Sequence, residues 1–426
     1  MRIRSGSATH KASYRSIFLR PLPLVAGIQT GKPRFLNATI VTITAILALL
    51  PFGLPAGGDE KAPKPRSHGD EAKAAGLDVK VLNALDAAMQ KQVEDGHVSG
   101  VICLIGRRGT IGYYEAFGHR VIEDDASMTK DTLFKIYSMT KPIVAATAMS
   151  VWEEGKFKLD DPIATHLPEW KTATVRQGGE TVPAKNQITP RHLLTHSAGL
   201  SYDRDGLNLS SDTTLPEFSA ALAKQPLKFE PGTGYVYGYA IDILGRYIEA
   251  IEGKSLDVVM RERVTDKLGM KDTEFWVRER GDRQRLARVY RKSSDGELKP
   301  AASRSGAMRK PARMMGGQGL ISTTGDYARF CQMLLNRGEL DGVRLLKTET
   351  VELMAQNHLK KIGKVYGLGG TVDGKGGYSW GGAAGTKFWI DSQNDTYGVF
   401  MIQRWGYKAP TYRVFRRYVE RARLEQ

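Results

Sequence analysis

Cysteine is scarce in this sequence, and no group of side chains has the spacing of a metal site. Only two of the 426 residues are cysteines. Cys103 lies in an apolar, strand-like run (residues 101–105), and Cys331 lies in a helix-like run (residues 326–336). Both are expected to be small buried side chains, so neither a disulfide bridge nor a metal pair is predicted. The sequence implies no metal, nucleotide or other cofactor.

Long apolar runs are also nearly absent. The one clear run, residues 38–50, is shorter than the ~20 residues that a membrane-spanning helix needs. Positive charges precede it, and a small-residue cleavage pattern follows it at residues 56–58. We therefore expect residues 1–58 to be a signal peptide or an N-terminal membrane anchor, with no integral membrane domain beyond it. The protein is expected to be exported, either to the periplasm or as a secreted protein.

This leader contains no acidic residues, and its basic residues contribute part of the strongly positive net charge of the chain. The formal net charge is +16, with 62 Lys and Arg against 46 Asp and Glu. No acid precedes Asp59, and the basic residues further along are scattered without interleaved aromatic residues. This pattern predicts a solvated basic surface and no nucleic-acid partner, with attraction to anionic envelope polymers as the alternative.

The composition changes twice along the chain. Residues 59–76 are rich in Lys, Pro, Gly and Ala and are expected to be a linker. Residues 77–426 are expected to form one domain, because no second linker and no internal repeat interrupts them. Hydrophobic residues make up 41% and charged residues 25% of the chain, which is typical of a packed globular core.

Strand-like patterns lie at both ends of this domain. Helices are predicted at residues 78–94, 138–154 and 410–424. Strands are predicted at residues 100–105, 110–117, 378–380, 386–391 and 396–403. Between about residues 160 and 346, short helices alternate with Gly/Pro loops. The arrangement predicts one sheet assembled from both chain ends and covered by an inserted helical region.

Ser138-Met-Thr-Lys141 is an S-x-x-K element at the start of a predicted helix. Residues three apart share a helix face, so the Lys141 amine can reach the Ser138 hydroxyl and accept its proton. The helix N-terminus adds free N–H groups and a positive dipole end, which suit a developing oxyanion. The spacing alone is equally typical of an N-cap serine beside a solvated lysine.

Further sequence blocks support a catalytic role for this pair. They are residues 134–142, 153–162, 188–200, 230–245, 316–326 and 380–385. In content and order they resemble the class C β-lactamase-related serine hydrolases, over roughly residues 75–426. The resemblance implies an α+β fold of the β-lactamase/DD-peptidase type. In that fold an antiparallel sheet is flanked by terminal helices and carries an inserted all-helical subdomain.

The resemblance also implies roles for individual residues. Tyr237 is implied as the second base beside Ser138, with Lys141 lowering the pKa of its phenol. Backbone N–H groups of Ser138 and of one residue in 380–383 are implied as the oxyanion hole, where glycine lets the backbone approach closely. His196 is implied as a structural core histidine. The residues predicted to line the oxyanion and substrate cleft with Ser138 are Trp380, Gly381, Gly382, Ala383 and Tyr239.

Two positions depart from the members of that family that hydrolyse lactams efficiently. Tyr239 stands where those enzymes have an asparagine whose amide binds the lactam side chain. Residues 380–382, Trp-Gly-Gly, stand where they have Lys-Thr-Gly, whose cation meets the antibiotic carboxylate. Both losses argue against tight recognition of anionic lactams. The pattern looks more like the family VIII carboxylesterases, which implies neutral ester substrates.

Residues 377–381 also match G-x-S-x-G, the nucleophile elbow of α/β-hydrolases. That motif requires a helix directly after Ser379 and a histidine further along the chain. The sequence after Ser379 is strand-like, and the last histidine is His358. An elbow at Ser379 is therefore excluded.

The leading functional hypothesis is a serine hydrolase that acts through an acyl-enzyme on Ser138, namely a carboxylesterase on small acyl esters. One alternative is a D-amino-acid peptidase, or a weak β-lactamase or penicillin-binding activity, on peptide-like substrates. An alternative of another class is a non-catalytic binding protein that keeps the fold. The presence of Ser138, Lys141 and Tyr237 together argues against the last alternative.

Overall fold

The computed structural model describes residues 68–203, 207, 209–301 and 305–424. The leader expected at residues 1–58 lies outside this part of the chain. Within the described ranges, no helix combines the length and the apolar character that crossing a bilayer requires.

A seven-stranded antiparallel sheet forms the centre of the fold, in the order β12-β13-β14-β15-β1-β2-β3. Its strands are β1 (Gly100–Arg107), β2 (Thr110–Val121), β3 (Ala126–Ser127), β12 (Thr371–Val372), β13 (Tyr378–Gly381), β14 (Lys387–Asp391) and β15 (Thr396–Met401). Strands β1 and β15 pair in the middle, with Ile102 opposite Met401. The prediction that both chain ends build one sheet is therefore confirmed.

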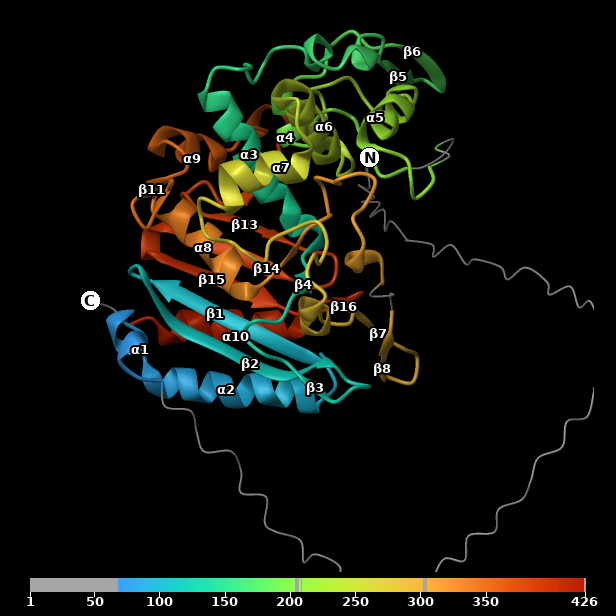
Figure 1. Cartoon of the computed structure of the whole chain (residues 1–426). Helices are drawn as coiled ribbons and strands as arrows, with labels where there is room; N and C mark the ends of the chain where they lie inside the picture. The colour runs from blue at the N-terminus through green and yellow to red at the C-terminus, as the bar shows by residue number, and fades with distance from the viewer. Residues whose placement is uncertain (1–67, 204–206, 208, 302–304, 425–426) are drawn as a thin grey trace, which may run out of the picture. The chain divides into compact units, whose positions relative to one another are not determined.

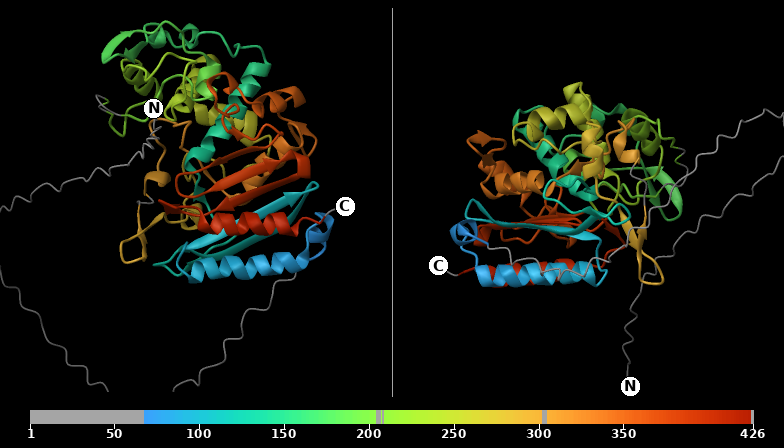
Figure 2. Two further views of the ribbon diagram at one scale, coloured as in Figure 1. Left: turned by 180° about the vertical axis from the view of Figure 1, so that it is seen from behind. Right: turned by 60° about the horizontal axis from the view of Figure 1, so that its bottom comes forward.

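Each face of the sheet is covered by helices (Figures 1 and 2). The terminal helices α2 (Val79–Glu94) and α10 (Pro410–Ala422) pack together on one face, and α8 (Thr324–Leu335) contacts the other. Side chains of β1 alternate between the two layers. Cys103 joins the core beneath the terminal helices, and Leu104 joins the core on the opposite face. This alternation explains why residues 101–105 of β1 are all apolar.

The folded unit begins earlier than the sequence indicated. Helix α1 (Asp70–Ala74) lies inside the segment expected to be a linker and contacts β2. Ala72 and Ala75 are buried there. The expected boundary at residue 77 was wrong, because the small alanines that fill this contact also give the segment the composition of a linker.

The region between the terminal strands is mainly helical. Besides α8, its α-helices are α3 (Thr140–Glu153), α4 (Pro190–Leu194), α5 (Leu215–Ala223), α6 (Ala240–Glu252), α7 (Leu256–Met260) and α9 (Thr348–Met354). It also contains the hairpin of β5 (Thr174–Gln177) and β6 (Glu180–Pro183). The inserted region is therefore not all-helical. The β5–β6 turn uses Gly178 and Gly179, both with positive φ, a signal that the Gly/Pro-rich loops of this region obscured.

Small sheets complete the fold, and two of them join segments that are far apart in the sequence. Strands β7 (Tyr290–Lys292) and β8 (Leu298–Pro300) join β16 (Arg404–Trp405), while β10 (Glu339–Leu340) pairs with β11 (Val343–Arg344). Strand β4 (Phe134–Lys135) pairs with β9 (Ile321–Ser322). This last pair holds the segment before Ser138 beside the segment after Gly317, which brings the two parts of the site together.

Candidate active site

Ser138 lies in a 3₁₀ turn, η1 (Tyr137–Met139), that leads directly into α3. The predicted helix therefore begins two residues later than Ser138. Tyr137 adopts a left-handed backbone conformation, with φ of 46°. The tight turn places the Ser138 hydroxyl at the N-terminal end of α3, where the helix dipole favours developing negative charge.

Lys141 is the second residue of α3 and is completely buried. Its Nζ atom lies 3.3 Å from Ser138 Oγ and donates to the hydroxyl of Tyr202 at 3.1 Å. It also donates to the carbonyl oxygen of Gly317 at 2.6 Å. The lysine is thus held by three neutral oxygen acceptors, one of which is the candidate nucleophile.

Tyr237 lies just before α6 and completes this arrangement. Its hydroxyl is hydrogen-bonded to Ser138 Oγ at 2.6 Å. Lys141 Nζ lies 4.5 Å from the centre of the Tyr237 ring. The structure therefore brings together the three residues that the sequence predicted as catalytic, with Ser138 Oγ between two groups that can exchange a proton with it.

His196 lies in the core beneath Tyr237, where a structural role is expected. Its ring is buried, lies 4.8 Å from the Tyr237 ring, and has no hydrogen-bond partner among the described residues. Burial and the nearby Lys141 charge hold the pKa of His196 well below its usual value. Its carbonyl accepts a hydrogen bond from Val236 N at 3.1 Å, which helps to fix the loop that carries Tyr237.

The 380–383 segment lies directly against the nucleophile turn. A methyl group placed on Gly382 would lie 2.4 Å from the carbonyl oxygen of Ile136, so only glycine fits there. The Gly382 N–H donates to the carbonyl of Thr386 at 2.8 Å. Gly381 is paired with Lys387 in the β13–β14 ladder. Ala383 is exposed in the turn after the ladder.

Trp380 forms an aromatic wall beside the trio. Its ring lies 5.7 Å from Tyr237 and 5.3 Å from Tyr366. The indole Nε1 is buried and has no hydrogen-bond partner in the described part of the chain. Trp380 therefore packs on Tyr237 and also belongs to the strand that borders the site.

Tyr239 does not lie where the sequence suggested. Only 2% of its surface is exposed, and its ring packs at 4.8 Å from Tyr202 and 5.2 Å from Phe218. It caps the start of α6 and is directed into the helical core. The expectation that Tyr239 lines the cleft was wrong, because Tyr202 from another loop stands between Tyr239 and Lys141.

Ser379 is excluded on structural grounds as well. It lies within β13, opposite Thr371 on one side and Trp389 on the other. A nucleophile elbow needs a sharp turn from strand to helix, and Ser379 is instead held in the interior of the sheet.

Three residues near Lys141 received no individual role from the sequence. Tyr202 and Gly317 accept hydrogen bonds from its ammonium group, and Asp242 accepts one from Gly317 N at 2.8 Å. Burial, and next the negative charge of Asp242, raise the pKa of Tyr202. Burial raises the pKa of Asp242 to about 6 despite the nearby Lys141. Two features of the sequence could have indicated these roles, namely the paired glycines at 316–317 and the acidic residue inside an otherwise apolar helix.

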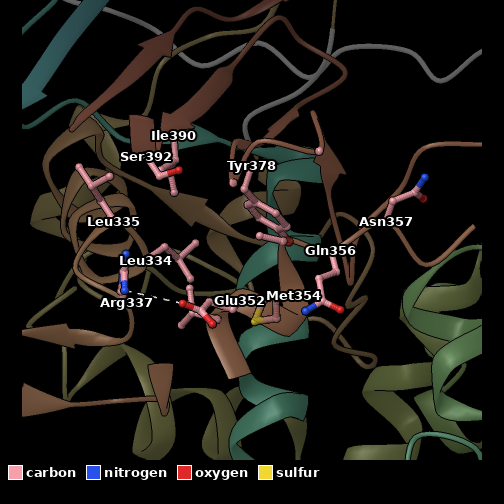
Figure 3. A pocket seen from close by; sticks show the side chains of 14 residues that line it. Leu334, Leu335, Arg337, Glu352, Met354, Gln356, Asn357, Tyr378, Ile390 and Ser392 are labelled. Atoms are coloured by element: carbon pink, nitrogen blue, oxygen red, sulfur yellow. Dashed lines mark ion pairs between the residues drawn. The ribbon is translucent and has the colours of Figure 1, made fainter. Parts of the chain in front are cut away.

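Two cavities lie at different places relative to the Ser138–Lys141–Tyr237 trio. A cavity of about 350 Å³ is lined by Tyr137, which precedes Ser138 in the chain, and by Phe275, Arg313, Met315 and Gln318, but by none of the trio. A cavity of about 500 Å³ lies between α8, α9 and β13 and contains none of the trio (Figure 3). An Arg337–Glu352 ion pair of 3.7 Å flanks this second cavity. Within the described residues, no group of three or more side chains is arranged to hold a metal ion.

An antiparallel sheet, a helical region and a serine–lysine–tyrosine site between them define a serine hydrolase of the β-lactamase/DD-peptidase fold. Residues 85–422 match the Beta-lactamase family model, and the chain belongs to that family.

Individual relatives support this assignment. Protein Rv1367c of Mycobacterium tuberculosis is 34% identical over 364 residues, covering 76% of this chain and 90% of the relative. Lovastatin esterase of Penicillium rubens is 30% identical over 374 residues, covering 75% and 92%. Among solved structures, EstCE1, a hydrolase with promiscuous acyltransferase activity, is similar with a TM-score of 0.70. It is 27% identical, covering 80% of this chain and 98% of EstCE1. The family thus includes esterase and acyltransferase relatives.

Proposed function

We propose that the protein is a carboxylesterase that hydrolyses small acyl esters through an acyl-enzyme on Ser138. The observation that carries this proposal is the position of Ser138 Oγ, 2.6 Å from the Tyr237 hydroxyl and 3.3 Å from Lys141 Nζ. A serine hydroxyl becomes an effective nucleophile when an adjacent base accepts its proton.

The proposed reaction has two half-reactions that use the same groups. The Tyr237–Lys141 pair accepts the Ser138 proton while Oγ bonds to the ester carbonyl carbon. The N–H groups of Ser138 and Ala383 stabilise the oxyanion. The carbon–oxygen bond to the alcohol then breaks, and the alcohol leaves with the proton. In the second half-reaction the pair takes a proton from water, the hydroxide bonds to the acyl carbon, and the carboxylic acid leaves as Ser138 regains its proton.

Electrostatics favour esters over anionic lactams. Trp380 and Gly381 supply no cation at the site. The nearest lysine on the adjoining strand, Lys387, lies with its Nζ 5.4 Å from the ring of Tyr412 on α10, so it points to the opposite face of the sheet. The 380–382 segment therefore offers no charge-assisted hydrogen bond to a substrate carboxylate. The esterase relatives agree with this preference.

Parallel assays of p-nitrophenyl butyrate and nitrocefin test the proposal. We expect a larger kcat/KM for the ester, and loss of ester hydrolysis in Ser138→Ala. A much larger kcat/KM for nitrocefin would instead support a β-lactamase or peptidase-like activity. Mass spectrometry after treatment with a fluorophosphonate probe distinguishes a serine hydrolase from a non-catalytic protein with the same fold. Folded protein without an adduct on Ser138 would make it a binding protein that keeps the fold.

We also propose that the protein is exported. The apolar run at 38–50, its basic flank and the small residues at 56–58 support this. N-terminal sequencing of protein from fractionated cells is the test. A new N-terminus near residue 58 indicates a cleaved signal peptide, and an intact N-terminus in the membrane fraction indicates an anchor. Intact protein in the cytosol would refute export.

A further inference from the structure

A buried carboxylate lies behind the Lys141 side chain. Asp242 is in the first turn of α6 and has no exposed surface. Its Oδ1 atom accepts a hydrogen bond from Gly317 N at 2.8 Å, and the carbonyl of the same Gly317 accepts from Lys141 Nζ at 2.6 Å. Asp242 and Lys141 are therefore connected through the two backbone polar groups of one residue.

The chain at Gly317 is shaped to allow this connection. A methyl group on Gly317 would lie 2.6 Å from Asp242 Oδ2. A methyl group on Gly316 would lie 2.7 Å from the carbonyl oxygen of Ile241. Two successive glycines let the backbone pass between the first turn of α6 and Lys141 without displacing either one.

Asp242 faces few other charges. Lys141 and Arg313 are the cations that act on its carboxylate, and the acidic neighbour it influences is the Tyr202 hydroxyl. Its Oδ2 atom is buried and has no hydrogen-bond partner among the described residues. Lys141, in turn, has no carboxylate within 4.0 Å in the described part of the chain. A buried anion with one unpaired oxygen is costly unless a nearby cation offsets it.

We infer that Asp242 is a positioning residue, whose carboxylate holds Gly317 in place and keeps the shared proton on Lys141 rather than on Tyr237. One proton divided between an amine and a phenol can give a neutral pair or an ammonium–phenolate pair. An anion that acts on the amine more strongly than on the phenol favours the ammonium–phenolate pair. Asp242 is connected to Lys141 through Gly317, and Lys141 is the charge that acts on it most strongly. Tyr237 is then the group that accepts the Ser138 proton. The inference rests on the proposed ester hydrolysis and specifies which member of the Tyr237–Lys141 pair acts as the base.

The direct test compares Asp242→Asn with Asp326→Asn. Asp326 is a matched control because burial also raises its pKa to about 6, while its carboxylate is bound by Asp272 N and Thr273. In the wild type, kcat/KM for p-nitrophenyl butyrate should fall as the pH drops below about 6, because Asp242 becomes protonated. Asp242→Asn should be about 10- to 100-fold slower at pH 8 and should lose this acid limb. Asp326→Asn should retain the limb.

The outcomes are distinguishable. A folded Asp242→Asn variant with the wild-type rate overturns the inference. A slower variant that keeps the acid limb near pH 6 also overturns it, because the effect is then only structural. If the wild type neither hydrolyses the ester nor labels with a fluorophosphonate, the proposed function fails instead.

A second measurement does not require Asp242→Asn to fold. Carbon-13 NMR of protein labelled at the aspartate side-chain carboxyl carbons follows each buried acid directly. In Lys141→Met, the pKa of Asp242 should rise by at least one unit because its cation is gone, while that of Asp326 should not change. Equal titration of Asp242 with and without the lysine charge would overturn the inference.

Discussion

Replacing Gly382 with alanine tests whether the 380–383 segment positions a ligand against Ser138. The added methyl would lie 2.2 Å from Thr386 Oγ1 and 2.4 Å from the carbonyl oxygen of Ile136. Side-chain Cβ atoms essentially never approach other heavy atoms below 3.0 Å. The segment and the nucleophile turn must therefore separate by about 0.6 Å or more, because Ile136 contributes backbone and cannot rotate away.

A displacement of this size acts on catalysis more than on folding. A misplacement of about 1 Å can cost on the order of 100-fold in rate, so we expect kcat/KM for p-nitrophenyl butyrate to fall about 10- to 100-fold. Overpacking of this kind costs roughly 1–3 kcal/mol of stability. Gly281→Ala is the matched control, because no heavy atom lies within 4 Å of its added methyl and its φ is not positive. It should retain wild-type kinetics.

Steady-state kinetics, fluorophosphonate labelling rates and thermal unfolding are measured on both variants. If Gly382→Ala keeps the wild-type kcat/KM, the 380–383 segment does not position the reacting group and the proposed Ala383 contribution is wrong. If Gly281→Ala loses as much activity, the loss reflects the glycine-to-alanine change itself.

Three further outcomes follow from buried groups. Cys103 and Cys331 are both fully buried with raised pKa values, so a thiol reagent should titrate no cysteine in the native protein and both after guanidinium denaturation. The pKa of His196 is lower in the folded than in the unfolded chain. Below about pH 6.5 the unfolded chain therefore binds a proton at this histidine that the folded chain does not bind. The free energy of unfolding consequently falls as the pH decreases. Calorimetry of His196→Phe should therefore give a smaller drop in Tm from pH 7.5 to 5 than the wild type. Tyr202→Phe removes an acceptor from Lys141 and should lower kcat/KM about tenfold without changing the far-UV circular dichroism spectrum.

The sheet and the central trio could be predicted because their signals are local or were carried by ordered blocks. The apolar β1 run and the S-x-x-K spacing each fix a local structure, and the resemblance supplied Tyr237. Helix α1 and the buried position of Tyr239 could not be predicted, because both depend on contacts with residues far away in the sequence. The alanines of α1 pack on β2, and the ring of Tyr239 packs on Tyr202 and Phe218. Asp242 was visible only as an acid in an apolar helix. Its connection to Lys141 runs through Gly317, 75 residues further along the chain, and sequence spacing does not encode such a contact.

The position of Tyr239 alters the reason for expecting ester substrates, while it leaves the expectation in place. The sequence suggested that a phenol replaces an amide at the cleft surface. In the structure Tyr239 is buried, and the hydroxyl that meets Lys141 belongs to Tyr202, whose ring packs against Tyr239 at 4.8 Å. Position 239 therefore supplies neither the amide nor another polar group to the site. The Tyr202 hydroxyl already accepts a hydrogen bond from Lys141, and the rings of Tyr237 and Trp380 form an aromatic wall beside Ser138. Such a surface discriminates poorly among acyl groups by hydrogen bonding and selects them by shape and apolar contact.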